Sequence, residues 1–227
     1  MCGRYASARS VDDLASTFGI SGDDIDPLPR PDWNVAPTKD AAVVVRRNDR
    51  TVLTTMRWGL VPSWADDPSV GSRMFNARVE TAAEKPAFRD AVRTRHCLVP
   101  ADGWFEWQVL PDGTRQPYFV TGADDAGVAF AGLWEHWRDA DGMVLRSMTI
   151  LTGPAPDELE WLHHRAPVVL PPSAWADWLV ADDVASLGPT DARVLVTWPV
   201  STRVGDVQVN GPELVARHEV DTQPPLF

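Results

Sequence analysis

The sequence lacks the features that mark secreted, membrane-spanning and zinc-stabilised proteins. Only two of its 227 residues are cysteines, Cys2 and Cys97, and neither belongs to a CxxC pair, so a structural zinc site is not expected. A disulfide between them is not expected in a reducing cytosol. No apolar run reaches the roughly 18 residues that span a bilayer, and the N-terminal stretch MCGRYASARS has no apolar signal core. We therefore expect a cytoplasmic protein that makes no membrane contact.

The chain also lacks the excess of positive charge that general duplex-DNA binders carry, because its net charge is −11. The charge is unevenly distributed. Residues 46–96 hold ten Lys and Arg against six Asp and Glu, so this segment is about +4 and the remainder about −15. A local basic surface on an acidic body is compatible with these counts, and so is an ordinary solvated surface.

What the chain has is the composition of a globular domain. Hydrophobic residues make up 44% of it, and eleven tryptophans suit a large core, base-stacking surfaces, or both. Expected short strands outnumber short helices and do not alternate regularly with them. We predict an α+β fold in a single domain (1–227), with a mostly antiparallel, barrel-like sheet flanked by short helices. Its core covers about 2–210, and 211–227 form a loosely packed C-terminal tail.

Capping signals locate two of the expected helices. Ser10 and Asp13 form a capping box, and Gly19 ends the apolar pattern that follows it. Thr81 and Glu84 resemble a second capping box. The pattern predicts helices at residues 10–18, 86–93, 157–162 and 173–180, and strands at 42–46, 51–58, 97–99, 104–107, 118–121, 128–134, 147–151, 168–170 and 194–198.

Cys2 carries the first candidate chemistry. Methionine before a small residue is commonly removed, which would leave Cys2 with a free α-amine beside its thiol. The reference pKa values of these groups are about 8 and about 8.5, so both are partly deprotonated near neutral pH. The amine can condense with an aldehyde to a Schiff base, and the thiol can then close a five-membered thiazolidine. Taken alone, however, Cys2 is more simply read as an ordinary second residue.

Two polar positions in the middle of the chain are further candidates. Asn76 and Arg78 offer an amide and a guanidinium fork suited to phosphate, in what is otherwise a polar loop leading to a helix. Glu106 lies in a strand between Phe105 and Trp107. It is either a desolvated carboxylate, whose raised pKa suits acid–base work, or a side chain on the solvated face of an edge strand.

A last cluster, His163-His164-Arg165, follows the helix expected at 157–162. A histidine beside an arginine can act as a proton donor next to a phosphate clamp. Adjacent side chains diverge, and no nearby carboxylate completes a ligand set, so we expect no metal.

Six motifs occur in order from the N-terminus to about Leu170, and together they closely resemble the SRAP family (SOS response-associated peptidase), the abasic-site processing proteins. The resemblance covers roughly three quarters of the chain. The motifs are MCGRY, WNVAPT from Trp33, RWGLVPSW from Arg57, NARVET from Asn76, CLVPADGWFEW from Cys97 and HHRAP from His163.

The resemblance implies a protein that senses abasic sites in single-stranded DNA and forms a reversible thiazolidine cross-link through Cys2 after removal of Met1, shielding the lesion. It implies no cofactor, and we expect a monomer that is cytoplasmic and associates with the nucleoid when bound to DNA. The implied catalytic residues are Cys2 as the nucleophile, Asn76 holding the Cys2 end and the opened sugar, Glu106 moving the proton of the α-amine, and His163 protonating the sugar ring oxygen. The implied DNA contacts are Arg4, Arg78, Thr152 and Arg165.

One departure from the family pattern concerns the histidine. Family members more often carry an acid or amide after it and Met before the proline, where this chain has His164 and Ala166. The spacing to Arg165 and Pro167 favours His163 over His164 as the reactive residue.

Two rival functions remain open from the sequence. Cys2 with His163 and Glu106 or Asn76 can form a cysteine peptidase site, although a nucleophile at the second position suits self-removal of Met1 better than turnover of other proteins. A non-catalytic module that binds single strands by stacking on tryptophan is the other rival.

Overall fold

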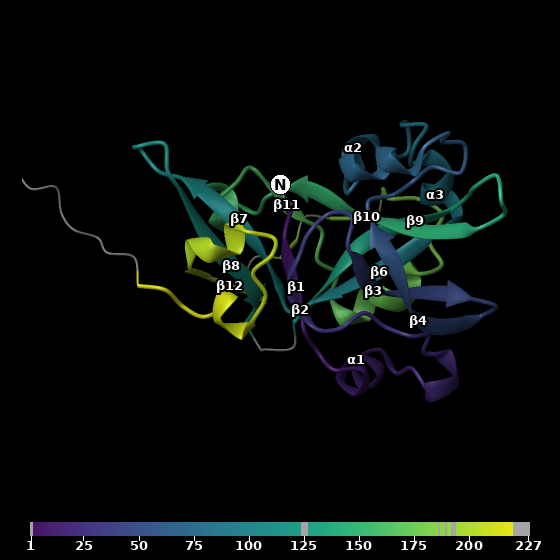
Figure 1. The fold of residues 1–227 in the computed structure, drawn as a ribbon, viewed down its shortest axis with the longest axis horizontal. Helices are drawn as coiled ribbons and strands as arrows, with labels where there is room; N and C mark the ends of the chain where they lie inside the picture. The colour runs from purple at the N-terminus through teal and green to yellow at the C-terminus, as the bar shows by residue number, and fades with distance from the viewer. Residues whose placement is uncertain (1, 124–126, 186, 189, 192–193, 220–227) are drawn as a thin grey trace, which may run out of the picture.

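The computed structural model describes residues 2–123, 127–185, 187–188, 190–191 and 194–219, and its strands form two sheets that lie side by side (Figure 1). The strands are β1 (Tyr5–Ser7), β2 (Asp32–Val35), β3 (Asp40–Arg47), β4 (Arg50–Trp58), β5 (Asn76–Arg78), β6 (His96–Ala101), β7 (Gly103–Val109), β8 (Arg115–Gly122), β9 (Val128–Arg138), β10 (Val144–Pro154), β11 (Arg165–Pro167) and β12 (Leu195–Pro199). The α-helices are α1 (Val11–Phe18), α2 (Val79–Ala82), α3 (Arg89–Thr94), α4 (Asp157–Glu160) and α5 (Trp175–Trp178).

Five strands close into a barrel in the order β10-β4-β3-β6-β9, because β9 also pairs with β10. Every pairing around this ring is antiparallel except that between β4 and β10, which is parallel. The second sheet, in the order β12-β8-β7-β1-β2, is antiparallel. Closure leaves the barrel strands without free edges. The predicted fold class, a mostly antiparallel, barrel-like sheet with short helices, is confirmed.

Local signals set the limits of α1, as predicted, and those of the β3–β4 hairpin. The Ser10 hydroxyl oxygen accepts a hydrogen bond from the Asp13 backbone N–H at 3.1 Å, and Gly19 ends α1 with a left-handed φ of 63°. Asn48 and Asp49 join β3 to β4 with φ values of 50° and 62°. Both central residues of a type I′ hairpin turn need such positive φ values, and Asn and Asp tolerate them.

The second capping box was a wrong prediction. Thr81 lies inside α2 and does not precede a helix, and α3 begins only at Arg89, after Phe88. Phe88, Ala91 and Val92 are all buried in one apolar cluster. Packing of these side chains onto the barrel therefore decides where the helix starts, in place of a capping side chain.

Other predicted elements are confirmed with shifted ends, except the strand expected at 168–170, where only Val169 forms an isolated bridge, to Phe130. Four short strands, β1, β2, β5 and β11, were not predicted. Strands of three or four residues are too short to show a period-2 pattern. Hydrogen bonding to longer neighbouring strands stabilises these short strands. In β5, for example, Asn76 aligns with Ile150 of β10.

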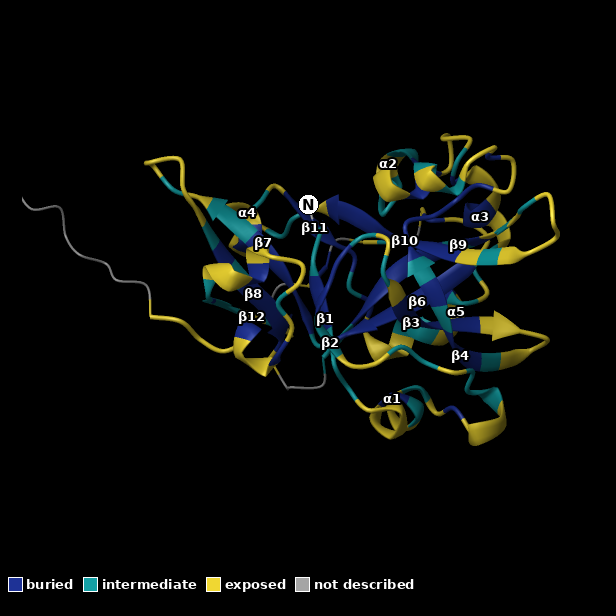
Figure 2. Cartoon of the chain, in the orientation of Figure 1, coloured by how far each residue is buried: buried dark blue, intermediate teal, exposed yellow. Residues whose placement is uncertain are grey.

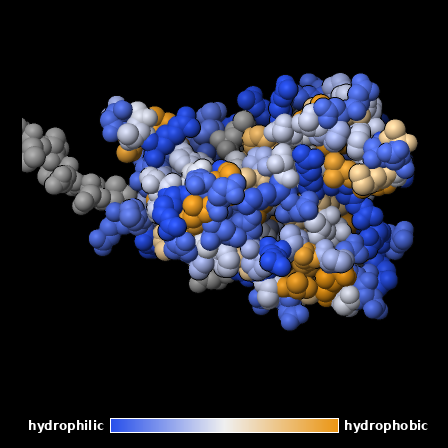
Figure 3. Space-filling view, viewed as in Figure 1, coloured by the Kyte–Doolittle hydropathy of each residue, from blue (hydrophilic) through white to orange (hydrophobic). Residues whose placement is uncertain are grey.

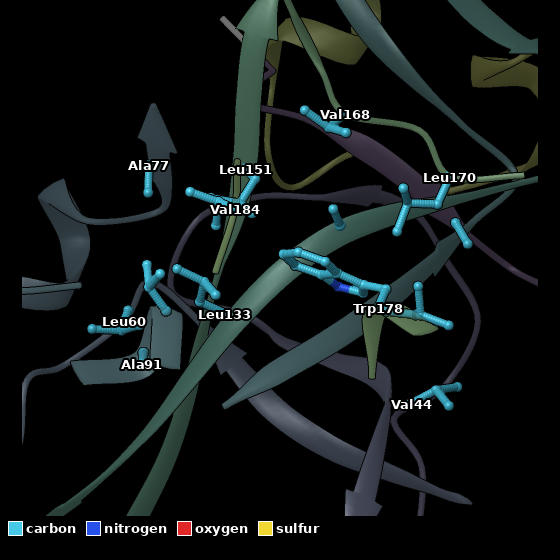
Figure 4. Close-up of a cluster of buried hydrophobic side chains, with 14 of the residues drawn as sticks. Val44, Leu60, Ala77, Ala91, Leu133, Leu151, Val168, Leu170, Trp178 and Val184 are labelled. Atoms are coloured by element: carbon cyan, nitrogen blue, oxygen red, sulfur yellow. The ribbon is translucent and has the colours of Figure 1, made fainter. Parts of the chain in front are cut away.

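Buried apolar side chains gather in three clusters. The first packs one face of the barrel strands against the helices, with Trp178 at its centre (Figure 4). The Trp178 indole N–H donates to the Cys97 carbonyl at 2.9 Å, which satisfies its one polar group. The second cluster, here called the seam, is formed by the other face of the barrel strands and continues to the second sheet. It includes Cys2, Tyr5, Trp104 and Phe130. Figure 2 shows the barrel strands β3, β6 and β10 mainly in the colour of buried residues.

The third cluster shows that the tail prediction was wrong for the residues just beyond Gly211. Leu214 is fully buried against Phe105 and Phe119 of the second sheet. The Trp198 indole N–H donates to the Val215 carbonyl at 2.9 Å, and the Arg217 guanidinium lies 4.8 Å from the Trp198 ring centre. Aromatic packing thus fixes this segment. Residues 220–227 lie outside the described residues.

The surface seen in Figure 3 is mainly hydrophilic. Part of the predicted basic segment is neutralised by acids from outside it, since Arg47 pairs with Asp26 at 3.1 Å and Arg50 with Asp24 at 2.8 Å. Any positive surface in the segment therefore has to come from its other arginines. Within the described ranges, no helix has the length and apolarity needed to cross a bilayer.

Candidate active site

The chain start lies at the seam, because β1 is paired on both sides. Tyr5 aligns with Val35 of β2 and with Trp104 of β7. This pairing carries Cys2, three residues before β1, into the seam, where it is fully buried. Burial, followed by the charge of Glu106, raises the pKa of the Cys2 thiol well above its ordinary value. The thiol is therefore held in its neutral form.

Asn76 holds the backbone of Cys2. Its side-chain amide donates to the Cys2 carbonyl at 2.6 Å. Asn76 is fixed in turn by its strand, because β5 runs parallel to β10 and pairs with it over three residues. The sequence prediction that Asn76 lies against the Cys2 end agrees with this contact.

Glu106 lies on β7, the middle strand of the second sheet, which has β8 on one side and β1 on the other. Only 5% of the residue is exposed. Alternation along β7 puts Phe105 in the third cluster and Trp104 in the seam, so Glu106 shares the face of Trp104. Burial raises the pKa of the Glu106 carboxyl above its ordinary value. The alternative of a solvated edge-strand position is thereby excluded.

His163 lines the same small hollow as Glu106 and Arg165, between β7, β8 and β11. Burial is the main cause that lowers the pKa of its imidazole. His164 is exposed and stacks its ring on that of His163, with 4.3 Å between ring centres. Of the two histidines, His163 is therefore the one beside Glu106.

The backbone of Arg165 contacts one ring nitrogen of His163 with two different groups. The Arg165 N–H donates to Nδ1 at 2.9 Å, and the Arg165 carbonyl oxygen lies 3.1 Å from the same atom. In the neutral ring Nδ1 accepts the first of these bonds, so the proton sits on Nε2. In the imidazolium Nδ1–H can donate to the carbonyl instead.

The side chain of Arg165 is buried and held by the protein. Its guanidinium forms a two-point ion pair with Glu80, at 2.8 and 2.9 Å, and donates to the Thr152 carbonyl at 2.6 Å. The Thr152 side chain is fully buried, with its hydroxyl 3.4 Å from the Ala77 carbonyl. Thr152 thus reaches the site through its backbone, and its hydroxyl faces the interior.

The other two predicted DNA-contacting arginines differ from each other. The Arg4 guanidinium is turned to the C-terminal segment, where it donates to Asn34 Oδ1 at 2.8 Å and to the Val204 carbonyl at 2.9 Å. Arg78 is exposed and makes no hydrogen bond or ion pair through its guanidinium with the described residues. The structure therefore gathers Cys2, Asn76, Glu106, His163 and Arg165 at the seam, places Arg78 beside them on β5, and separates the Arg4 side chain from them.

In the part of the chain that the structure describes, no three His, Cys, Asp or Glu side chains are grouped to hold a metal. A cavity of about 520 Å³ lies elsewhere, between α1 and the segment after β11, with Phe18 and Trp175 in its wall. None of the predicted site residues lines it. The chemistry-bearing side chains therefore cluster at the seam and not in this apolar cavity.

Comparisons with known proteins agree with this arrangement of motifs. The sequence profile of the SOS response associated peptidase (SRAP) family matches residues 1–207. The abasic site processing protein YoqW of Bacillus subtilis is 34% identical over 224 residues, which cover 96% of this chain and 100% of YoqW. This chain belongs to the SRAP family.

Three further proteins resemble this chain. The abasic site processing protein YedK of Escherichia coli is 32% identical over 95% of this chain and 99% of its own length. A crystal structure of a Bordetella bronchiseptica protein matches with a TM-score of 0.75 at 29% identity, over 88% of this chain and 100% of that one. A Bacteroides thetaiotaomicron protein shares the fold, with a TM-score of 0.84 at 20% identity over 96% and 100% of the two chains.

The sequence did not indicate the roles of two polar residues, one that pairs with a site residue and one that holds Arg4 away from the site. Glu80 stands within the NARVET motif, but nothing in the motif indicates that it pairs with Arg165, which is 85 positions away. Asn34 of the WNVAPT motif is fully buried, accepts from Arg4, and donates to the Asp206 and Val209 carbonyls. A polar residue inside a family motif was the available signal in both cases.

Proposed function

We propose that this protein processes abasic sites in single-stranded DNA by forming a reversible covalent cross-link through Cys2, once hydrolysis of the Met1–Cys2 peptide bond has freed the Cys2 α-amine. The cross-link shields the lesion. The observation that carries the proposal is the setting of Cys2: its carbonyl is held by Asn76 at 2.6 Å, within electrostatic reach of the buried Glu106 carboxylate. Relatives bearing the name abasic site processing protein support the substrate.

The chemistry begins at the amine. An abasic sugar exchanges between a closed ring and an open aldehyde. His163 gives a proton to the ring oxygen as the bond from that oxygen to C1 breaks, and the C1 hydroxyl loses its proton to water and becomes the aldehyde carbonyl. The α-amine adds to the aldehyde carbon, and loss of water leaves an imine. The thiol then adds across the C=N bond, sulfur to carbon and the thiol proton to nitrogen, which closes the thiazolidine. Glu106 carries protons to and from the amine nitrogen in these steps.

The high pKa of the thiol supports this order of events. A neutral thiol is a weak nucleophile, so the amine attacks first and the thiol acts afterwards, when the ring closure is intramolecular. Because the thiol lies next to the imine carbon, it can add to that carbon without first forming a free thiolate in bulk water. The neighbouring Glu106 charge, which disfavours the thiolate, then costs the reaction little.

DNA contact is proposed to come first from Arg78. It is exposed on β5, two residues from Asn76, and its guanidinium is free to take a phosphate. Arg4, Thr152 and Arg165 are held by protein partners, so their contribution to DNA binding is to shape the surface beside the lesion. Because an abasic site has no base to unstack, displacing it from the strand costs little.

A cysteine peptidase is the second candidate, favoured by the description of the family as peptidases. Such an enzyme needs a thiolate, yet burial and Glu106 both raise the pKa of the Cys2 thiol. This argues against turnover of other proteins and leaves hydrolysis of the protein's own first peptide bond as the peptidase activity to consider.

The decisive experiment is denaturing gel electrophoresis of the protein with single-stranded DNA that carries one abasic site, with the N-terminal mass measured in parallel. We expect a slow-migrating adduct with the protein that lacks Met1. Acetylating the α-amine should abolish it, whereas a thiol protease tolerates that block. Absence of any adduct from a protein whose Cys2 amine is shown to be free would refute the proposal.

A further inference from the structure

An exposed tryptophan lies at the edge of the site, and nothing in the chemistry above uses it. Trp161 directly follows α4, two residues before His163, and 48% of it is exposed. Its indole N–H donates to the Glu158 carbonyl at 2.9 Å, so its one polar group is satisfied within its own turn. The exposed part of Trp161 is therefore an apolar ring surface.

The Trp161 ring is held near Glu106 by Tyr118. The centres of the Trp161 and Tyr118 rings lie 5.0 Å apart, with their planes at 85°, an edge-to-face contact that covers at most one face of the indole. Tyr118 of β8 aligns with Glu106 of β7, so these two side chains share one face of the second sheet. On either side of Trp161 in the sequence, Leu159 and His163 line the same hollow as Glu106. The Trp161–Tyr118 pair therefore lies beside this hollow.

The two sides of the site differ in charge. Arg78, exposed on β5, lies on the barrel side, because β5 pairs with β10. The α4 side carries the exposed acids Asp157, Glu158 and Glu160. Figure 2 shows α4 and α2, which directly follows β5, on opposite sides of the N-terminus. A single strand that passes between them meets a cation on one side and acids around an aromatic ring on the other.

These charges determine which part of the DNA meets Trp161. Phosphates are attracted by Arg78 and repelled by the carboxylates of α4, so the DNA backbone lies toward β5. The bases then face α4. Bases of any identity stack on an exposed aromatic ring, because every base has a π-face.

We propose that Trp161, supported by Tyr118, is a stacking platform for the nucleobase next to the abasic site. This inference rests on the proposed function, in which the lesion itself lies at Cys2 and His163. Stacking of the neighbouring base holds the strand in place, since the lesion has no base of its own to stack.

The binding test uses single-stranded DNA in which a tetrahydrofuran residue, an abasic sugar that cannot open to an aldehyde, replaces the lesion. Trp161→Ala should weaken binding of this strand by about 5–150-fold, the range for loss of one base–aromatic stack. Trp161→Phe should lose less, because a ring remains. Trp161→Leu, which keeps an apolar contact to Tyr118, should lose as much as Trp161→Ala. The slope of log K against log salt should stay that of wild type, because no phosphate contact is lost.

A second set of strands identifies the base. In these, the nucleotide on the 5′ side or on the 3′ side of the tetrahydrofuran residue also lacks its base. One of the two should bind wild type more weakly, and Trp161→Ala should weaken that one no further, because both changes remove one contact. Met143→Ala is the matched control, since Met143 is an apolar residue, 69% exposed, between β9 and β10 and should change no affinity. The inference is overturned if Trp161→Ala weakens every strand equally or weakens none.

Cross-linking rates separate stacking from a disturbance of His163. They are measured on two oligonucleotides, one with a true abasic site and one with an aldehyde that cannot close into a ring. Loss of stacking should slow both reactions at subsaturating DNA and neither at saturating DNA. A Trp161→Ala defect that persists at saturating DNA on the true abasic site alone would assign the effect to His163 and overturn the inference.

Because the binding test needs no chemistry, the inference and the proposed function can fail separately. A wild type that binds the tetrahydrofuran strand but forms no adduct with either aldehyde-forming oligonucleotide refutes the proposed function alone. Normal adduct formation together with unchanged binding by Trp161→Ala refutes the stacking platform alone.

Discussion

Two glutamates buried to the same extent define two different regions of the molecule. Glu106 at the seam is 5% exposed and Glu135 near the far end of β9 is 4% exposed. Glu135 is paired with Arg95 at 2.7 Å and accepts the His136 backbone N–H at 2.9 Å. Glu106 lies beside the buried Cys2 thiol, and its burial raises the pKa of its carboxyl. Burial of a carboxylate by itself therefore does not mark a reactive site; its neighbours do.

We expect changes at the seam to alter the chemistry and changes around Glu135 to alter stability alone. Chemistry that survives changes at the seam, or that changes around Glu135 alter in a folded protein, would contradict this expectation.

Cys2→Ala should have the largest effect, complete loss of the stable adduct, because no thiol is left to close the thiazolidine. The new α-amine can still form an imine, which a reductant should trap. Denaturing gels with and without reductant measure both outcomes. A stable adduct formed by this variant without reductant would contradict the mechanism.

Glu106→Gln should slow cross-linking of both the true abasic site and the open aldehyde by about 10²–10⁴-fold, the range for loss of an acid–base group. Reversal of the cross-link should slow as well, because it retraces the same proton transfers. Single-turnover rates on the two oligonucleotides measure this. His163→Ala should differ by sparing the open aldehyde, so equal defects in that variant would assign ring opening elsewhere.

The same Glu106→Gln variant should melt at a higher temperature than wild type at neutral pH. The folded-state pKa of Glu106 lies above its ordinary value of 4.5, so the folded protein binds this proton more tightly than the unfolded chain. The carboxyl therefore reduces stability as pH rises through the interval between these two pKa values. Thermal melts should show the gain at neutral pH and its disappearance below about pH 4, where the carboxyl is protonated in both states.

Arg95→Ala should destabilise the fold by about 3 kcal/mol, since it leaves the buried Glu135 charge without its cation. Cross-linking should be unchanged at temperatures where the variant is folded. Glu135→Gln is the paired control and should cost less, because no charge remains buried. Denaturant unfolding and cross-linking assays together measure this, and loss of cross-linking without loss of stability would break the comparison.

Arg78→Ala should have the smallest effect, weaker binding with the chemistry intact at saturating DNA. Loss of one phosphate contact should make the slope of log K against log salt shallower by about 0.7 for a single strand. Arg138→Ala, at the far end of β9, is the control and should leave the slope unchanged. A slope equal to wild type in Arg78→Ala would remove Arg78 from the phosphate contacts.

Much of the architecture follows from local sequence patterns. The Ser10 cap, Gly19 and the Asn48–Asp49 turn act through their own backbone, so their neighbours in sequence suffice to predict α1 and the β3–β4 hairpin. The start of α3 and the packed segment around Leu214 depend on partners far along the chain, so local patterns misplaced them. For the site, the motifs indicated which residues to consider but not their contacts.

The sequence by itself determined the chemical groups, a thiol and latent amine at Cys2, a carboxylate between aromatic residues, and a histidine beside an arginine, because residue identity fixes what each can donate or accept. Only the tertiary structure decided how these groups behave. Pairing of β1 with β2 and β7 buries Cys2 and Glu106 in one seam, and burial sets their pKa values. The Glu80–Arg165 pair spans 85 residues, so it exists only because β10 lies between β5 and β11 and brings them together.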